Sequence, residues 1–368
     1  VRKPEAGGIV AWGDNYNGQA EPPTAITNIV ALAGGYAHSV ALTDDGHVYA
    51  WGGNQHGQTN VPLDLTNATA IACGNGHTLA LKADGTLAVW GRTNYGLWNI
   101  PPECTNVVKI AAGGLHNLVL LQDGSLREWG TNYGPIPATA TNITAIASGY
   151  DFDLALRGDG TVVAWGYPTW GQTNVPGGLT NVVAIAAGEH HALALKRDGR
   201  VVAWGTGVYG ETNVPADLTN VMAIAANAGT SMALRNDGKV RVWGPNHAGQ
   251  TNVMVGLPPV NVIGAGGGTP LVALYSSLVQ YPVDVTKDLL LIYNANSLDS
   301  SNVCAYYLAH RPMVSQANLL PIGCTNTESF LPSEYTNVFV PQIGNWLANN
   351  PTKRPQYVIL FLDIPSRV

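Results

Sequence analysis

The hydrophobic positions of this chain fall into short runs with two-residue alternation, and the runs recur at a spacing of about 39 residues. One complete unit, TNVVAIAAGEHHALALKRDGRVVAWG at 180–205, contains three such runs. Alternation of apolar and polar positions over four to eight residues indicates a β-strand with one buried face. Asp-Gly joins the last two runs, and this pair favours the tight turn of a hairpin. Each unit is therefore predicted to form a small antiparallel sheet.

A Trp-Gly pair ends each unit. The pairs begin at Trp12, Trp51, Trp90, Trp129, Trp165, Trp204 and Trp243. The spacing is 39 residues throughout, except for 36 residues between Trp129 and Trp165. Units of about 40 residues with three or four strands are typical of β-propeller blades. We expect the Trp side chains to form the core between blades, because aromatic side chains bury large areas.

Seven Trp-Gly pairs accompany only six Asp-Gly hairpins. The first Trp-Gly strand, at 7–13, has no hairpin partner before it, and the last apolar run, at 269–276, has no Trp-Gly strand after it. Joining the two runs completes one more blade and removes the exposed edges of an open array. The predicted fold is all-β, a seven-bladed β-propeller at 7–278 whose last blade is closed by the N-terminal strand, after a short tail at 1–6.

Four motifs recur in phase over the same region: Trp-Gly, AAG-x-x-H-x-x-AL, the Asp-Gly hairpin, and N-x-x-GQ after the Trp. Together they resemble the repeats of the regulator of chromosome condensation (RCC1) family, in its compact bacterial form. The founder of that family is a nucleotide-exchange factor for a small GTPase and also binds chromatin. The chain lacks the founder's basic tail and inserted wedge, so the resemblance implies the fold and a protein-binding role before either activity.

The pattern changes from about residue 279 onward. Apolar runs at 288–296, 317–323 and 356–368 are predicted strands, and helical spacing appears at 300–311 and 333–350. The alternation of strand and helix predicts a parallel α/β unit. The segments YNANSLDS, YYLAHR and LDIPSRV resemble the start of an α/β family of unknown function in envelope-associated bacterial proteins. This C-terminal segment, 279–368, is expected to be an incomplete α/β domain.

Histidines occupy one repeat position in four blades. They are His38, His77, His116 and His191, and the other blades have Phe152, Thr230 and Pro270 there. A metal-binding ring is one interpretation. The favoured interpretation is structural, with each imidazole bridging backbone groups inside its own blade, because buried histidines normally find hydrogen-bond partners.

An aromatic or histidine residue follows each Trp by four or five positions. The set is Tyr16, His56, Tyr95, Tyr133, Trp170, Tyr209 and His247. Equivalent loops of a propeller emerge on one face, so these rings are candidates for an aromatic rim that binds a protein or a glycan. The alternative, which repetition favours, is that each ring packs over the neighbouring Trp-Gly turn.

Polar residues follow two predicted strands of the α/β segment. Asn294, Asn296, Asp299 and Ser300 follow the first strand, and Asp363 follows the third. The carboxyl ends of parallel strands are where open α/β sheets bind ligands, so Asn294, Asp299 and Asp363 form a second candidate site. Asp299 is equally well explained as the start of a helix. No G-x-S-x-G or H-E-x-x-H motif and no Gly-rich phosphate loop occurs, and no catalytic residue, metal or cofactor is predicted.

Composition limits the classes of partner that the chain can bind. The net charge is −6 and no run of Lys or Arg occurs, which disfavours nucleic acid because phosphate binding needs a basic surface. No apolar stretch reaches the ~20 residues of a membrane span. The four cysteines, Cys73, Cys104, Cys304 and Cys324, match no zinc spacing. Cys73 is interpreted as a small buried residue, and a bond between Cys304 and Cys324 is left open.

Three functions follow from these features. The favoured one is a binding or scaffolding protein, extracellular or in the cell envelope, that presents a propeller face to a protein or glycan. The second is a targeting module for a hydrolase-like α/β domain, and the third is a regulator of a small GTPase. The half-finished sheet after residue 279 also favours self-association through that segment.

Overall fold

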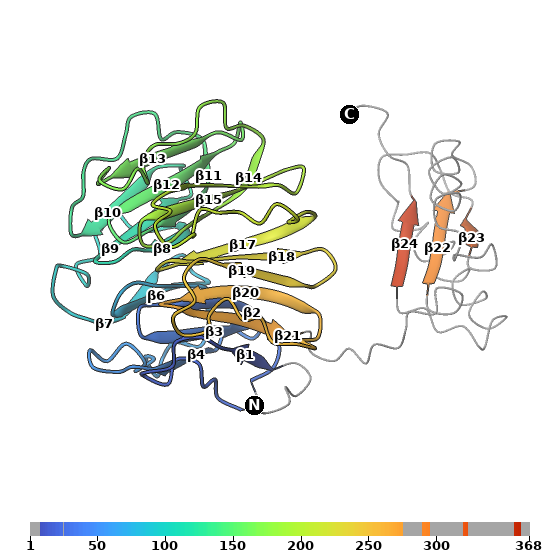
Figure 1. Ribbon diagram of the computed structural model, residues 1–368, viewed down its shortest axis with the longest axis horizontal. Helices are drawn as coiled ribbons and strands as arrows, with labels where there is room; N and C mark the ends of the chain where they lie inside the picture. Colours follow the sequence, from blue (N-terminus) through green and yellow to red (C-terminus); the bar gives the residue numbers. More distant parts are fainter. Residues whose placement is uncertain (1–7, 25, 275–288, 295–318, 323–356, 362–368) are drawn as a thin grey trace. The chain divides into compact units, whose positions relative to one another are not determined.

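The computed structural model describes residues 8–24, 26–274, 289–294, 319–322 and 357–361. The chain divides into two compact units, 1–277 and 278–368. Within the described residues every regular element is a β-strand (Figure 1), and no helix in them is long and apolar enough to cross a membrane.

The first unit contains seven antiparallel sheets of three strands each. The inner strands are β2 (Ile29–Gly34), β5 (Ala68–Cys73), β8 (Val107–Ala112), β11 (Ile143–Ser148), β14 (Val182–Ala187), β17 (Val221–Asn227) and β20 (Val260–Gly266). The middle strands are β3 (His38–Thr43), β6 (His77–Lys82), β9 (His116–Leu121), β12 (Phe152–Arg157), β15 (His191–Lys196), β18 (Thr230–Arg235) and β21 (Thr269–Leu274). The outer strands are β4 (Val48–Gly52), β7 (Leu87–Gly91), β10 (Leu126–Gly130), β13 (Val162–Gly166), β16 (Val201–Gly205), β19 (Val240–Trp243) and β1 (Ile9–Ala11).

The outer strand of the last sheet comes from the start of the chain. β1 pairs antiparallel with β21, with Ile9 opposite Ala273 and Ala11 opposite Leu271. The sheet order is β1-β21-β20, and β20 contacts both β17 and β2 of the flanking sheets. The two ends of the repeat region are therefore joined within one sheet.

Each inner strand starts with a bend. A register shift lies after its first residue in every sheet, for example between Ile29 and Ala31 and between Val182 and Ala184. The preceding residue is often an Asn in the left-handed conformation, as at Asn28, Asn106, Asn142, Asn181 and Asn220. Asn tolerates positive φ better than other residues with a Cβ. The Thr-Asn that opens many units thus turns the chain into the inner strand.

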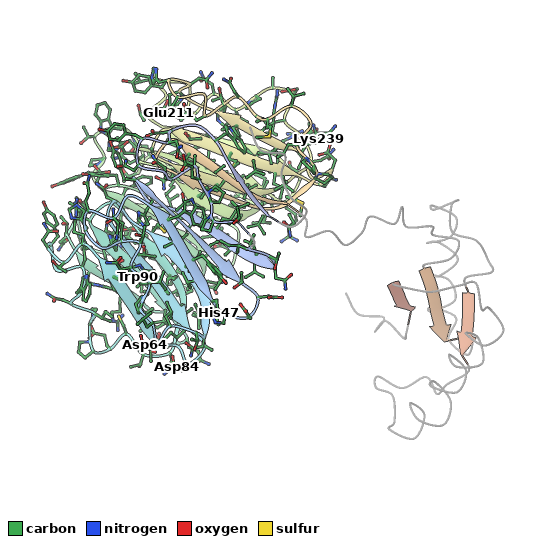
Figure 2. All side chains as sticks on the ribbon, turned by 90° about the horizontal axis from the view of Figure 1, so that it is seen from below. His47, Asp64, Asp84, Trp90, Glu211 and Lys239 are labelled. Atoms are coloured by element: carbon green, nitrogen blue, oxygen red, sulfur yellow. The ribbon has the colours of Figure 1, made fainter. Side chains whose placement is uncertain are left out.

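The core lies between neighbouring sheets. In one cluster Val40 and Leu42 of β3 pack with Ala80 of β6 and Trp90 of β7. The other six clusters of the first unit repeat this arrangement, and six of the seven Trp side chains are buried. The Trp of the Trp-Gly pair is therefore inter-sheet core, as the sequence predicts, and Figure 2 shows Trp90 among the strands.

The inner strands surround a central cavity of about 380 Å³. Its wall consists mostly of Ala and Gly residues. The amide of Asn227 spans part of the wall, donating to the carbonyls of Gly34 and, at 3.2 Å, of Ala265. Cys73 also lines the cavity and is half-buried rather than fully buried as predicted. Burial raises the pKa of its thiol to about 12, so the side chain is an unreactive thiol at neutral pH.

The second unit contains three described strands. They are β22 (Leu289–Asn294), β23 (Leu319–Ile322) and β24 (Tyr357–Phe361), and β22 lies between the other two. Both pairings are parallel, as the alternation of strand and helix predicts. The two predicted helices, at 300–311 and 333–350, lie outside the described residues.

Candidate functional site

Two sets of segments share one end of each sheet: the turns after the inner strands and the loops after the outer strands. The amide of Gly53 donates to the carbonyl of Ala37 at 2.7 Å, and the amide of Thr206 donates to the carbonyl of His190 at 2.9 Å. We call this end the loop face and the end with the Asp-Gly turns the hairpin face. The loop face comprises 13–19, 35–37, 53–60, 74–76, 92–99, 113–115, 131–136, 149–151, 167–174, 188–190, 206–213, 227–229, 245–252 and 266–268.

A buried Gln holds the loop after the outer strand. The Gln58 side chain is 3% exposed, and its Oε1 accepts the amide of His56 at 2.8 Å. Gln172 does the same for Trp170, and Glu211 for Tyr209. The Asn at the start of the loop closes it further, because Asn54 accepts the amide of Thr59 at 3.1 Å. The N-x-x-GQ motif therefore fixes the loop backbone from within.

The predicted rim residues are mostly exposed. Tyr16 is 92% exposed, Tyr95 52%, Trp170 49% and Tyr209 61%. His56 and His247 are also exposed, and Tyr133 is half-buried. These six side chains are exposed, and His56 also lies beside the neighbouring Trp-Gly turn, with its Nε2 2.8 Å from the Arg92 guanidinium. The buried Gln explains this result, since it takes the inner position of the loop and leaves the ring outside.

The rim is less regular than the sequence predicts. We call the position of Gln58, Gln172 and Glu211, whose side chains accept the amide two residues earlier, the locking position. Two residues before it stand His56, Tyr95, Trp170 and Tyr209. Tyr16 and His247 stand three residues before it, and Asn17 and Ala248 stand two residues before it. Tyr133 belongs to the shortened loop and packs edge-on against His116, with ring centres 5.2 Å apart.

Further aromatic side chains join the rim on part of the loop face. Trp98 is 48% exposed and Tyr167 52%, on the loops that also carry Tyr95 and Trp170. The Trp170 ring lies 5.7 Å from that of His190, a residue of the neighbouring turn. The sequence pattern did not predict Trp98 and Tyr167, because both fall outside the repeated position.

The four repeated histidines connect neighbouring sheets. His77 Nε2 lies 2.9 Å from Asn117 Oδ1 of the next sheet, and His38 and His191 contact Thr78 and Ser231 in the same way. The prediction that each imidazole bridges backbone groups of its own blade is wrong. The partner is a side chain 40 residues later, because the middle strands of adjacent sheets face each other.

The hydrogen bonds of His38, His77 and His191 are each part of a longer series that ends at a backbone carbonyl of a loop. Asn117 Nδ2 donates to the carbonyl of Leu97 at 3.4 Å, and Trp129 Nε1 donates to the same carbonyl at 2.9 Å. Because the Asn amide donates there, its Oδ1 accepts from His77, which therefore carries its proton on Nε2. The signal for this partner was present in the sequence as a polar residue directly after the repeated histidine.

A glycine three residues before each histidine makes room for the ring. A Cβ built on Gly74 would overlap the imidazole of His77, and Gly35 and Gly188 face His38 and His191 in the same way. The rings are completely enclosed, and burial lowers the pKa of His38 to about 3 and those of His77 and His191 to about 4. These three histidines are neutral at physiological pH.

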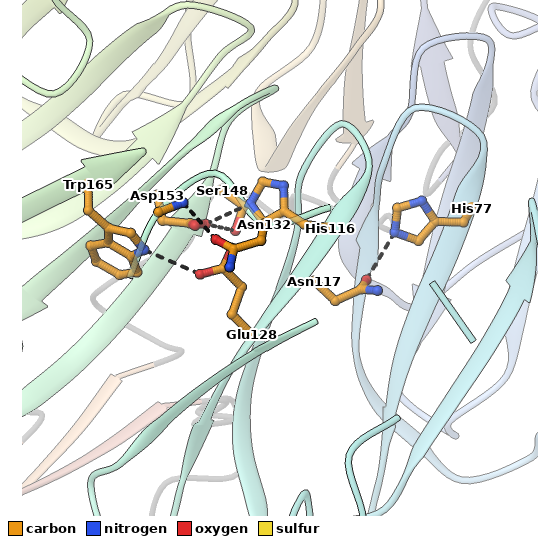
Figure 3. A network of polar contacts seen from close by, with 9 residues as sticks. His77, His116, Asn117, Glu128, Asn132, Ser148, Asp153 and Trp165 are labelled. Atoms are coloured by element: carbon orange, nitrogen blue, oxygen red, sulfur yellow. Dashed lines mark hydrogen bonds and ion pairs between the residues drawn. The ribbon is translucent and has the colours of Figure 1, made fainter. Parts of the chain in front are cut away.

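The fourth histidine has a different environment (Figure 3). His116 Nε2 contacts Asp153 Oδ1 at 3.0 Å, with the two side chains 0% and 1% exposed. Ser148 Oγ donates to the same oxygen at 2.5 Å. Burial lowers the pKa of His116, but the charge of Asp153 and its hydrogen bond outweigh burial and raise the pKa overall.

The loop after Trp129, beside His116, belongs to the unit with the short spacing of 36 residues. The carboxylate of Glu128 takes the place of the loop carbonyl that accepts a Trp indole in the other units. Six Trp indoles of the first unit donate to a loop carbonyl at 2.9–3.0 Å. Trp165 instead donates to Glu128 Oε2 at 3.4 Å. Burial raises the pKa of Glu128 to about 7, and the charge of Asp153 adds to this effect.

Two departures from the repeat mark Glu128 in the sequence. The residue before the Trp is Ala or Val in the other units, for example Ala50, Val89 and Ala203. A Glu in this small apolar position coincides with the only spacing of 36 residues. Together these two departures mark the sector where the hydrogen-bond pattern changes.

A family model described as "Regulator of chromosome condensation (RCC1) repeat" matches residues 29–58, 68–97 and 182–211. The chain is an RCC1-like repeat protein. No curated protein sequence matches the chain significantly.

Solved structures show the same propeller fold as this RCC1-like chain. Prp20p from Saccharomyces cerevisiae is 21% identical, covers 72% of this chain and 91% of its own, and gives a TM-score of 0.60. Human WBSCR16 is 18% identical over 73% of this chain and 99% of its own, with a TM-score of 0.60. The ectodomain of the Physcomitrella patens receptor kinase CR4 is 22% identical over 68% and 71%, with a TM-score of 0.58.

The matched RCC1 repeats each run from the inner strand to the locking position of the loop, ending at Gln58, Leu97 and Glu211. The sector of Glu128 and Asp153 falls outside the matched stretches. The matched stretches contain the pairs Gly35 and His38, Gly74 and His77, and Gly188 and His191. The unit of Gly113 and His116, where two carboxylates enter, is not matched.

The second candidate site lies almost wholly outside the described residues. Asn294 is the last residue of β22, at the carboxyl end of the middle strand, while Asp299 and Asp363 are not among the described residues. Cys304 and Cys324 also fall outside them.

Proposed function

We propose that this RCC1-like chain is a protein-binding module that uses its loop face. The observation that carries the proposal is the group of exposed aromatic side chains on three loops, Tyr95 and Trp98, Tyr167 and Trp170, and Tyr209. Large aromatic side chains contribute most of the binding energy in many protein interfaces. The seven sheets would act as the seven blades of one closed ring that holds these loops in place.

The loops are suited to binding because their backbones are already fixed. The buried Gln172 accepts the amide of Trp170 at 2.8 Å, and Glu211 accepts that of Tyr209 at 2.8 Å. A partner therefore does not need to order these loops, which lowers the entropic cost of association. This argument favours a rigid docking surface over a flexible recognition loop.

The charge of the loop face supports a protein partner over nucleic acid. Among the residues that the structure describes there, Arg92 is the only Lys or Arg, and its guanidinium lies 2.8 Å from His56 Nε2. Basic side chains such as Lys239 belong to the hairpin face, whereas Glu211 belongs to the loop face (Figure 2). Phosphate binding needs a basic surface, and the loop face does not provide one.

The structural neighbours agree with this use of the fold. Prp20p binds Gsp1p and histones, and yeast RCC1 (Prp20) binds Kap60. At 20–21% identity they support a protein partner in general and no particular one. A glycan partner, an extracellular or envelope location and self-association through the C-terminal segment remain predictions from the sequence.

The test compares loop-face and outer-strand variants of the whole chain as bait in a pull-down. The loop-face variant carries Tyr95→Ala, Trp170→Ala and Tyr209→Ala. The control carries Tyr49→Ala, since Tyr49 is 40% exposed but lies on β4. We expect the proteins enriched by the wild-type chain to be recovered at least tenfold less with the loop-face variant and equally with the control.

Two results would contradict the proposal. One is equal recovery with the loop-face variant, and the other is loss with Tyr49→Ala alone. A glycan array run with the same three proteins separates the sugar alternative. Binding to a glycan that the loop-face variant loses, without any protein partner, would replace the proposed partner class.

A further inference from the structure

We propose that His116, Glu128 and Asp153 form a binding site for one divalent metal ion, best matched by zinc. Each residue offers one ligand atom, and these three atoms all lie within 4.8 Å of one another. The residues come from β9, β10 and β12, so two neighbouring sheets hold the site. Rigid strands fix ligand geometry more precisely than loops do.

The donor set matches zinc by chemistry. One imidazole nitrogen and two carboxylate oxygens are ligands that Zn²⁺ accepts at about 2.0–2.2 Å. Softer thiolate ligands and the all-oxygen sets that magnesium and calcium prefer are both absent from this cluster. Three protein ligands leave a fourth position for water.

An unpartnered buried atom points independently to a missing ligand. Glu128 Oε1 is buried and has no hydrogen-bond partner, while Oε2 accepts only the 3.4 Å contact from Trp165. A buried carboxylate oxygen without a partner is costly. A metal ion bound to this oxygen satisfies it, and the Trp165 indole then orients the carboxylate from behind, as outer hydrogen bonds commonly do at metal sites.

The charge of the cluster also calls for a cation. The charged or titratable groups that act on His116 are Asp153, Glu128 and Asp151, and those that act on Glu128 are Asp153 and His116. His116 is thus the single basic group facing two carboxylates, of which Asp153 is 1% exposed. The His116 imidazolium balances Asp153, and a divalent ion would in addition balance the charge of Glu128 once that carboxyl has lost its proton.

The shortened loop borders a surface pocket that Glu128 lines and that His116 and Asp153 do not. Glu128 lines a surface pocket of about 520 Å³ together with Asn132, Gly134 and Ile136. On binding, the metal takes the place of the proton between His116 Nε2 and Asp153 Oδ1, and that proton leaves to solvent. No oxidation or reduction is involved.

The chain contains a matched site without carboxylates. His77 and Asn117 hold the same positions as His116 and Asp153 and contact each other at 2.9 Å. Val89 stands where the other sheet has Glu128. A generic effect of histidine burial would appear at both sites, whereas metal binding is expected at one.

The experiment titrates Zn²⁺, and then Co²⁺, into the metal-stripped whole chain by calorimetry and absorption spectroscopy. We expect one tight equivalent in the wild-type chain. Glu128→Gln and Asp153→Asn should each weaken it at least tenfold, while His77→Gln leaves it unchanged. Near-ultraviolet circular dichroism confirms that each variant is folded, and the indole N–H resonance of Trp165 should shift on zinc addition only where the site is intact.

Three outcomes would overturn the proposal. They are no binding by the folded wild-type chain, equal binding after Glu128→Gln, and loss of binding after His190→Gln. His190 is half-buried near Asp151 and Glu189 on the loop face and is the competing site for an added metal. The proposal is independent of the partner-binding role, since none of its residues belongs to the aromatic set tested above.

Discussion

At the scale of single residues, this protein depends on a histidine and a glycine that repeat together. The imidazole reaches the next sheet, as His77 does to Asn117 at 2.9 Å. The glycine three residues earlier leaves space for the ring. The histidine that contacts the next sheet therefore requires a glycine three residues earlier, because any Cβ there would overlap the imidazole. This requirement explains the Gly-x-x-His pattern.

The buried histidines make folding sensitive to acid. The pKa of His38 is lowered to about 3 and those of His77 and His191 to about 4, whereas unfolded histidines titrate near 6.5. Between these values the unfolded chain binds three more protons, so stability falls as pH drops. Glu128, with its pKa raised to about 7, opposes this between pH 7 and 4.5 by one proton.

We therefore expect the free energy of unfolding to fall by up to about 2.7 kcal/mol per pH unit below pH 6.5, a net of two protons. Urea unfolding at pH 7, 6 and 5 measures this slope. His77→Gln should reduce the slope by about one proton, or about 1.4 kcal/mol per pH unit. A slope of opposite sign, or one that His77→Gln leaves unchanged, would contradict the assignment.

At the scale of elements, the loop after each outer strand is a small folded unit of its own. Asn54 and Gln58 accept the amides of Thr59 and His56, and Trp90 Nε1 donates to the carbonyl of Gln58 at 3.0 Å. The loop thereby satisfies the buried indole of the following sheet. Sheet, loop and next sheet form one connected hydrogen-bond pattern.

Gln58→Ala should loosen this loop without unfolding the sheet. The His56 amide loses its 2.8 Å acceptor, so we expect its hydrogen exchange to accelerate and the free energy of unfolding to fall by about 1–3 kcal/mol. Gln58→Glu is the matched control, because Glu211 performs the same role for Tyr209, and exchange at His56 should stay slow in it. Unchanged exchange at His56 in Gln58→Ala would show that another group holds the loop.

At the scale of the whole molecule, the pairing of β1 with β21 joins the start of the repeat region to its end. Trp12 Nε1 donates to the carbonyl of Gln250 at 2.9 Å, and the ring packs against the cluster that contains Val10 and Met232. The N-terminal strand therefore supplies both an edge and part of a core. Without it, β21 presents an unpaired edge.

Deletion of residues 1–12 should destabilise the propeller and promote association. Loss of a packed Trp costs about 3–5 kcal/mol, and the exposed edge of β21 offers a pairing site to a second chain. Urea unfolding and light scattering after size-exclusion chromatography measure the two effects. Deletion of residues 1–6 is the control and should leave both unchanged. Equal stability of the two deletions would contradict a structural role for β1.

Much of the fold is visible in the sequence because it is repeated. The Trp-Gly pairs, the Asp-Gly turns and the apolar alternation each predict strand or turn locally, and their recurrence makes the prediction robust. The candidate rim was less predictable. Tyr16 and His247 follow their Trp by four residues and Tyr95 follows its Trp by five, so the first two lie one residue out of register with the third. Trp98 and Tyr167 escaped because they are not repeated.

What the sequence by itself determined is the strand pattern of each unit and the RCC1-like character of the repeats, since both depend on short-range alternation and spacing. Only the tertiary structure decided what the repeated histidine contacts, because its partner lies 40 residues away on a neighbouring sheet. It also decided that Glu128 and Asp153 meet His116. Two carboxylates meet one buried histidine beside a loop that is three residues shorter, and no local pattern in the sequence predicts that contact.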